Sequence, residues 1–186
     1  MNLMNLLAFI FAVYFLIAFT LVHLIKKEYL FKKDALSEYA VGKWGFIITI
    51  AFFVIAFNQF LLSWKFFQSN HFFPSLFLAL SGLGVLIVAI VKVHKRKDEL
   101  LKIHDFGAAM QFIFFPLALI SYFIFSRNAF FTLVIGLITF IFIFILRDAN
   151  NKYDRGEISN FGLIEKINIL LINSWLIVIS YLNVFY

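Results

Sequence analysis

The sequence has no cysteine and few charged residues, and each shortage excludes a class of protein. Without cysteine, the 186 residues can form no disulfide, thiolate nucleophile or cysteine metal site. Charged residues make up only 14% of the sequence, whereas apolar residues make up 63%. This leaves too little polar surface to cover a water-soluble protein, so the composition predicts an integral membrane protein.

Long apolar runs, separated by short polar segments, take up most of the chain. A helix of about 20 apolar residues is long enough to cross the hydrocarbon core of a bilayer. The first run is too long for the apolar core of a signal peptide, so we expect it to be retained. We predict an all-α polytopic membrane protein, a single domain over residues 1–186 that forms a bundle of six transmembrane helices. The expected spans are about 3–25, 44–64, 72–91, 106–125, 129–146 and 163–185.

Two of the polar connections have features of their own. In residues 26–43, apolar side chains recur among the charges at roughly helical intervals, which favours a short helix lying in the membrane interface. Residues 147–160 carry many polar and charged side chains and are expected to form the last polar loop.

The basic residues are distributed very unevenly. Fourteen of the 16 lysines and arginines fall in the first, third and fifth connections or next to them, which six crossings place on one side of the membrane. Because short loops rich in lysine and arginine stay in the cytoplasm, we predict a multi-pass protein of the bacterial inner (plasma) membrane with both termini outside the cytoplasm.

The densest charge run lies between the third and fourth apolar runs. Its basic residues are expected to attract anionic lipid headgroups, although they could also serve only to fix the topology. The residues proposed for headgroup contact are Lys92, Lys95, Arg96 and Lys97.

Polar residues at the starts of the fourth and sixth runs form the candidate binding site. His104 and Gln111 are seven residues apart and therefore lie along one helical stripe. We expect a pocket at the cytoplasmic mouth between these two helices. The alternative is that the carboxylates cap or stabilise helix starts and that the amides bond neighbouring helices. The candidate ligand-binding residues are His104, Asp105, Gln111, Asp148, Glu165 and Asn168.

Three histidines provide a second hypothesis. His23, His94 and His104 are all expected near the same membrane face, where acidic residues could complete a zinc site. No cofactor other than zinc is expected.

Several short motifs, spread over nearly the whole chain, resemble those of the bacterial six-helix membrane proteins classified as the domain of unknown function 998 family. This resemblance implies a six-helix fold and no settled activity. The matching residues are Ser37, Glu38, Tyr39, Gly42, His104, Asp105, Ala108, Phe112, Pro116, Gly162, Glu165, Lys166 and Trp175.

Two functions follow from these observations. The first is a membrane protein that binds a lipid, a small amphiphile or a partner protein through its polar mouth, and a homo-oligomer is compatible with it. The second is a zinc-dependent membrane hydrolase. Nothing in the sequence indicates binding to nucleic acid. A channel or pump would require charged residues in the middle of the membrane, and the apolar runs have none there.

Overall fold

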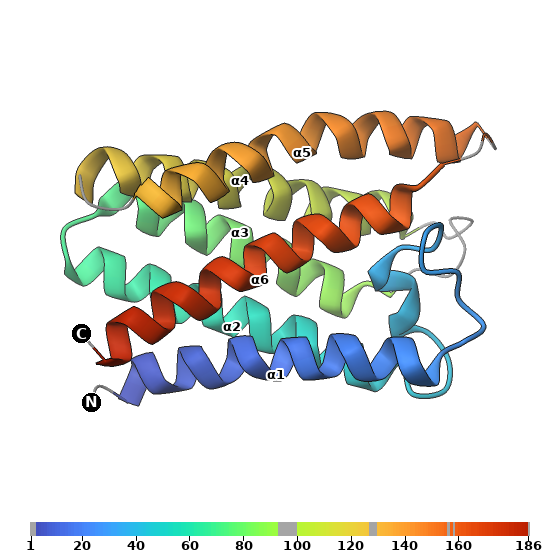
Figure 1. The fold of residues 1–186 in the computed structure, drawn as a ribbon, viewed down its shortest axis with the longest axis horizontal. Coiled ribbons are helices and arrows are strands. Elements are labelled where there is room, and N and C mark those ends of the chain that lie inside the picture. Colours follow the sequence, from blue (N-terminus) through green and yellow to red (C-terminus); the bar gives the residue numbers. More distant parts are fainter. Residues whose placement is uncertain (1–2, 93–99, 127–129, 156, 158, 186) are drawn as a thin grey trace.

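The computed structural model describes residues 3–92, 100–126, 130–155, 157 and 159–185 (Figure 1). These residues form six α-helices and one short 3-10 helix, and no strand occurs among them. Each α-helix is long and apolar enough to cross a membrane, which confirms the predicted all-α polytopic fold. The elements are α1 (Leu3–Ile25), η1 (Leu36–Ala40), α2 (Phe46–Gln68), α3 (Phe72–Ile90), α4 (Leu101–Ser126), α5 (Phe130–Asp154) and α6 (Phe161–Phe185).

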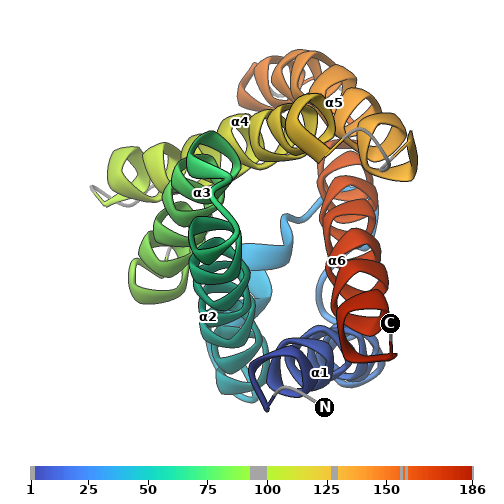
Figure 2. The ribbon, with the colours of Figure 1, turned by 90° about the vertical axis from the view of Figure 1, so that its left-hand side faces the viewer.

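The helices stand side by side in a ring (Figure 2). Each helix contacts the next one along the chain, and α6 returns to contact α1, which closes the ring. The two ends of the chain lie at the same end of the ring, as six antiparallel crossings require (Figure 1). We call the opposite end, where the segment between α1 and α2 lies, the polar end.

Small residues let α3 and α4 approach each other closely. A Cβ atom added to Gly84 would lie 2.4 Å from the carbonyl oxygen of Gly107. The two backbones therefore touch at a point where any side chain would push them apart.

Polar side chains inside the ring bond the helices to one another. The Asn58 amide donates to the Ala8 carbonyl over 2.9 Å, and the Asn173 amide donates to the Ala12 carbonyl over 3.1 Å. Trp175 donates its indole N–H to the Thr132 hydroxyl over 3.1 Å. These bonds provide partners that lipid cannot supply, because a bilayer core offers no water.

Four helices extend beyond the apolar runs that predicted them. α2 ends at Gln68 rather than at 64. α4 begins at Leu101 rather than at 106, α6 begins at Phe161 rather than at 163, and α5 continues past 146 to Asp154. Most of the segment expected to be the last polar loop is therefore helical. Hydropathy predicts where a helix leaves the membrane. The backbone hydrogen bonds of the helix can continue into water, as long as water or partner residues satisfy the polar side chains of that part.

The segment between α1 and α2 also differs from expectation. It contains no α-helix, and only η1 is regular, with all five of its residues buried. Instead of lying flat in the interface, the segment folds under the polar end of the ring, where it is seen through the ring in Figure 2.

Candidate functional site

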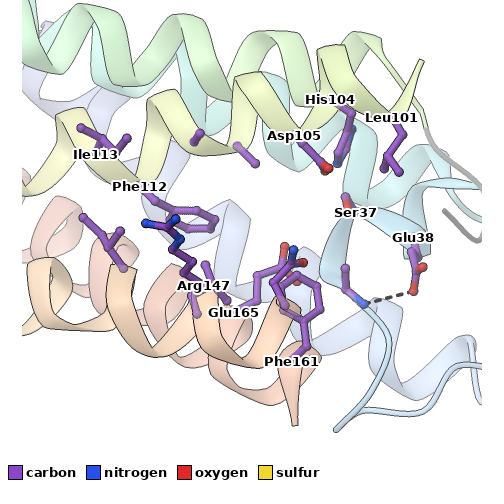
Figure 3. A pocket seen from close by; sticks show the side chains of 16 residues that line it. Ser37, Glu38, Leu101, His104, Asp105, Phe112, Ile113, Arg147, Phe161 and Glu165 are labelled. Atoms are coloured by element: carbon purple, nitrogen blue, oxygen red, sulfur yellow. Dashed lines mark hydrogen bonds between the residues drawn. The ribbon is translucent and has the colours of Figure 1, made fainter. Parts of the chain in front are cut away.

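A cavity of about 370 Å³ lies at the polar end, between α4, α5, the start of α6 and η1 (Figure 3). Near the far end of the α4–α5 pair the two helices are close together: a Cβ on Gly136 would lie 3.0 Å from the Leu119 Cβ. The cavity occupies the other end of the same pair. Its volume falls within the range of roughly 300–1,000 Å³ that is usual for small-molecule sites.

One part of the cavity is apolar. Ala108, Phe112 and Ile113 line it from α4, and Ile143 and Leu146 face them from α5. All of these residues lie farther from the polar end of their helix than the ionisable lining residues on the same helix, and Leu146 does so by one residue. The cavity therefore extends from an apolar inner part to a polar mouth.

Ionisable and polar side chains from four elements converge on the mouth. Since α4 begins at Leu101, its second turn carries His104 and Asp105 on the same helical face as the apolar residues one turn and two turns farther on. The polar residues that line the cavity are Ser37, Glu38, His104, Asp105, Arg147, Asn150 and Glu165.

The end of α3 orients the His104 ring. Its Nδ1–H donates to the Val91 carbonyl oxygen over 2.7 Å, and the side chain is only 6% exposed. Because a carbonyl can only accept, the proton must sit on Nδ1, and the other nitrogen of the neutral ring is then a hydrogen-bond acceptor. This bond fixes the orientation of the His104 ring in the cavity wall.

Two buried carboxylates hold η1 as a wall of the cavity. Glu165 accepts a hydrogen bond from the Leu36 backbone N–H over 2.7 Å, and Glu38 accepts one from the Ala35 backbone N–H over 3.1 Å. The alternative to ligand binding was that Glu165 stabilises the start of its own helix. It lies in the second turn of α6 and bonds the start of η1 instead, because the segment before α2 folds against α6.

Two buried lysines fasten the same segment. Lys166 on α6 is fully buried and donates to the carbonyl oxygens of Phe31 (3.0 Å) and Asp34 (2.5 Å). Lys26 donates to the carbonyls of Tyr39 (3.0 Å) and Val41. Burial lowers the pKa of Lys26 and raises that of the Tyr39 phenol to about 12, so Tyr39 is neutral at physiological pH.

The other three candidate ligand-binding residues lie outside the cavity. Gln111 lines a separate, much smaller void inside the ring, together with Asn173. Asn168 is fully buried, and neither polar atom of its amide has a hydrogen-bond partner among the described residues. Asp148 points outward, with 64% of its side chain exposed, and pairs with Lys152 over 2.7 Å. Gln111 therefore faces a different part of the ring from its neighbours Phe112 and Ile113, which line the cavity.

The candidate metal ligands are also separated in part. His104 lines the cavity, whereas His23 is not among the lining residues and packs against Phe19, Phe31 and Tyr39. His94 lies outside the described residues. Within the described part of the chain, no three histidine, aspartate or glutamate side chains are grouped so that they could hold a metal ion.

The basic run proposed for lipid headgroups is described only at its start. Lys92 is exposed just after α3. Lys95, Arg96 and Lys97 lie outside the described residues.

Four polar residues of the cavity were not among the sequence candidates: Ser37, Glu38, Arg147 and Asn150. Asn150 had been assigned only to the last polar loop. Arg147 had been counted only as a topology signal at the end of an apolar run. Ser37 and Glu38 belong to a motif of the family resemblance, but nothing in their spacing relates them to residues more than sixty positions away. Only the folding of the segment before α2 against α4 and α6 brings them to the cavity.

Comparison with known families gives one result. A family model described as "Protein of unknown function (DUF998)" matches residues 9–181, which is almost the whole chain. No curated protein and no solved structure matches the chain.

Proposed function

Because the chain belongs to the DUF998 family, whose description assigns no activity, we propose a function from the cavity itself. The protein binds a single-chain amphiphile at the polar end of its helix ring. The tail lies against the apolar inner wall, and the head group lies among the ionisable residues of the mouth.

The observation that carries this proposal is the order of side chains along the cavity. From Ile113 to Asp105 on α4 the lining changes from apolar to charged over eight residues, which correspond to about 12 Å of helix. A purely polar ligand would leave the apolar inner wall without an apolar partner. A purely apolar ligand would place buried carboxylates beside hydrocarbon, which is costly. An amphiphile matches both parts.

The location of the cavity supports the same function. It lies where α4 and α5 leave their apolar runs, which is the depth at which lipids change from tail to head group. Asp105 and Ala109 on α4 and Arg147 on α5 are exposed, so the cavity is open between these helices. An amphiphile from the adjoining leaflet would therefore have a lateral route into it. We place this polar end in the cytoplasmic half of the membrane, following the distribution of basic residues.

Native mass spectrometry of the detergent-purified protein tests the proposal. The wild-type protein, incubated with a mixture of palmitoyl lysophospholipids, should retain one molecule per chain. Ala108→Trp fills the inner part of the cavity and should abolish retention.

Leu137→Trp is the matched control, because Leu137 lies on α5, outside the cavity lining, and is 47% exposed. It should bind lysophospholipid like the wild type. If the wild-type protein retains none, or if both tryptophan variants bind it equally well, the proposed function is wrong.

A further inference from the structure

We infer that the head group of this amphiphile is zwitterionic, with a phosphate next to the tail and an ammonium group farther out. The inference rests on the proposed function and specifies the ligand of the same cavity. It follows from the sign and order of the charges that line the wall.

The charges of the lining are unequal in number. Three carboxylates face one guanidinium, since Glu38, Asp105 and Glu165 line the cavity with Arg147. Glu38 and Glu165 are 8% and 7% exposed, so bulk water screens them only weakly. The buried Lys166 interacts with Glu165 and Glu38 and offsets part of their charge, but it does not line the cavity. At this part of the wall a cationic group is therefore favoured over a purely anionic one.

The charges are also separated along the cavity. In the view of Figure 3, Arg147 is drawn at the level of Phe112, toward the apolar part, and Glu38 is drawn at the opposite end, beyond Ser37. Asp105 and Glu165 lie between these two, on facing walls. Passing outward from the tail site, a ligand therefore meets the guanidinium first and the carboxylates afterwards.

This order is that of a phosphoethanolamine head group. Its phosphate follows the glycerol ester directly and is an anion that a guanidinium binds well. Its terminal ammonium has three N–H donors for carboxylate oxygens, the Ser37 hydroxyl and the acceptor nitrogen of His104. A phosphoglycerol head group has the same phosphate but carries hydroxyls in place of the ammonium.

The test is a competition between two lysophospholipids that share the palmitoyl chain and differ only in the terminal group. Equal concentrations of lysophosphatidylethanolamine and lysophosphatidylglycerol are added to the detergent-purified full-length protein, and bound species are counted by native mass spectrometry. The ethanolamine form should be preferred about tenfold or more, as expected for a charge-assisted hydrogen bond of about 1.5–3 kcal/mol.

Variants assign the two ends of the head group. Glu165→Gln retains an oxygen that can accept the Leu36 N–H, and Asp105→Asn changes an exposed side chain, so both should fold and should reduce the preference severalfold. Arg147→Gln should weaken the binding of both lysophospholipids and leave the preference for the ethanolamine form in place. Glu157→Gln, an exposed residue paired with Arg155 outside the lining, is the control and should change neither.

The possible failures are distinguishable. If the wild-type protein binds the glycerol form as well as the ethanolamine form or better, or if neither acidic variant alters the preference, the head-group inference is wrong and amphiphile binding stands. If neither lysophospholipid binds, the proposed function itself is overturned.

Discussion

Single residues at the polar end combine structural and binding roles. Glu165 lines the cavity and also accepts the hydrogen bond that starts η1. These two roles depend on different properties of the side chain. The first depends on its negative charge, and the second depends only on an oxygen acceptor at the right place, so substitutions can separate them.

Glu165→Leu should destabilise the protein by about 1–3 kcal/mol, because it leaves the buried Leu36 N–H without an acceptor. Glu165→Gln should cost much less, since its amide oxygen can take the same bond. Thermal unfolding in detergent, followed by a fluorescent reporter of exposed protein, measures the difference. Equal melting temperatures for the two variants would show that this hydrogen bond contributes little.

Lys166 is the second residue with a separable structural role. Its ammonium group is fully buried and bonded to the carbonyls of Phe31 and Asp34. Lys166→Met should release residues 31–34 from α6, because methionine has a similar length but no N–H donors. Limited trypsin digestion should then cut faster after Lys32 and Lys33, both of which are exposed.

The control for that digestion is Lys152→Met, which removes an exposed lysine that pairs with Asp148 one turn away on α5. Its cleavage rate after Lys32 and Lys33 should match that of the wild type. An unchanged rate in Lys166→Met would mean that other contacts suffice to hold the segment.

At the scale of elements, the close contact between α3 and α4 depends on glycines, which have no side chain, at the point where the two backbones meet. Gly84 faces the Gly107 backbone, and a Cβ at Gly84 would also lie 2.7 Å from the Gln111 nitrogen. Backbone atoms cannot rotate away as a flexible side chain can. The helices themselves would have to move, and α4 carries one wall of the cavity.

Gly84→Ala should therefore lower stability by about 1–3 kcal/mol, the usual range for overpacking. It should also weaken amphiphile retention, because α4 must shift. Gly136→Ala is the matched control on α5, where the contact nearest to the new Cβ would be 3.0 Å, to the Leu119 Cβ, rather than 2.4 Å. A Gly84→Ala protein as stable as Gly136→Ala would contradict the close backbone contact.

At the scale of the whole molecule, the ring places both chain ends on one side (Figure 1). The residues that line the cavity lie at the other side. This arrangement holds for either orientation in the membrane. The orientation depends on the basic residues, and it decides which leaflet supplies the amphiphile.

A phosphatase that is active only outside the cytoplasm should be active when fused to the C-terminus and inactive when fused after Arg155. The reason is that fourteen of the 16 basic residues lie on the side of Arg155. Phosphatase activity on bacterial cells measures the two fusions. The reverse pattern would invert the orientation and leave the six crossings intact.

The sequence alone was sufficient to predict the number and type of helices. Apolar runs of this length have few other stable forms in a bilayer, since each backbone N–H and C=O must be bonded within its own segment. It also identified three residues of the cavity, His104, Asp105 and Glu165, because polar residues that immediately border an apolar run are placed at the membrane surface by that run.

Only the tertiary structure decided which polar residues meet. Helical spacing links Gln111 to His104 along α4, yet Gln111 lines a separate void. Glu38 reaches the cavity because the segment after α1 folds under the ring and is bonded there by Glu165 and Lys166 of α6. Such pairings depend on side-chain hydrogen bonds between segments more than a hundred residues apart, and hydropathy and local spacing carry no information about them.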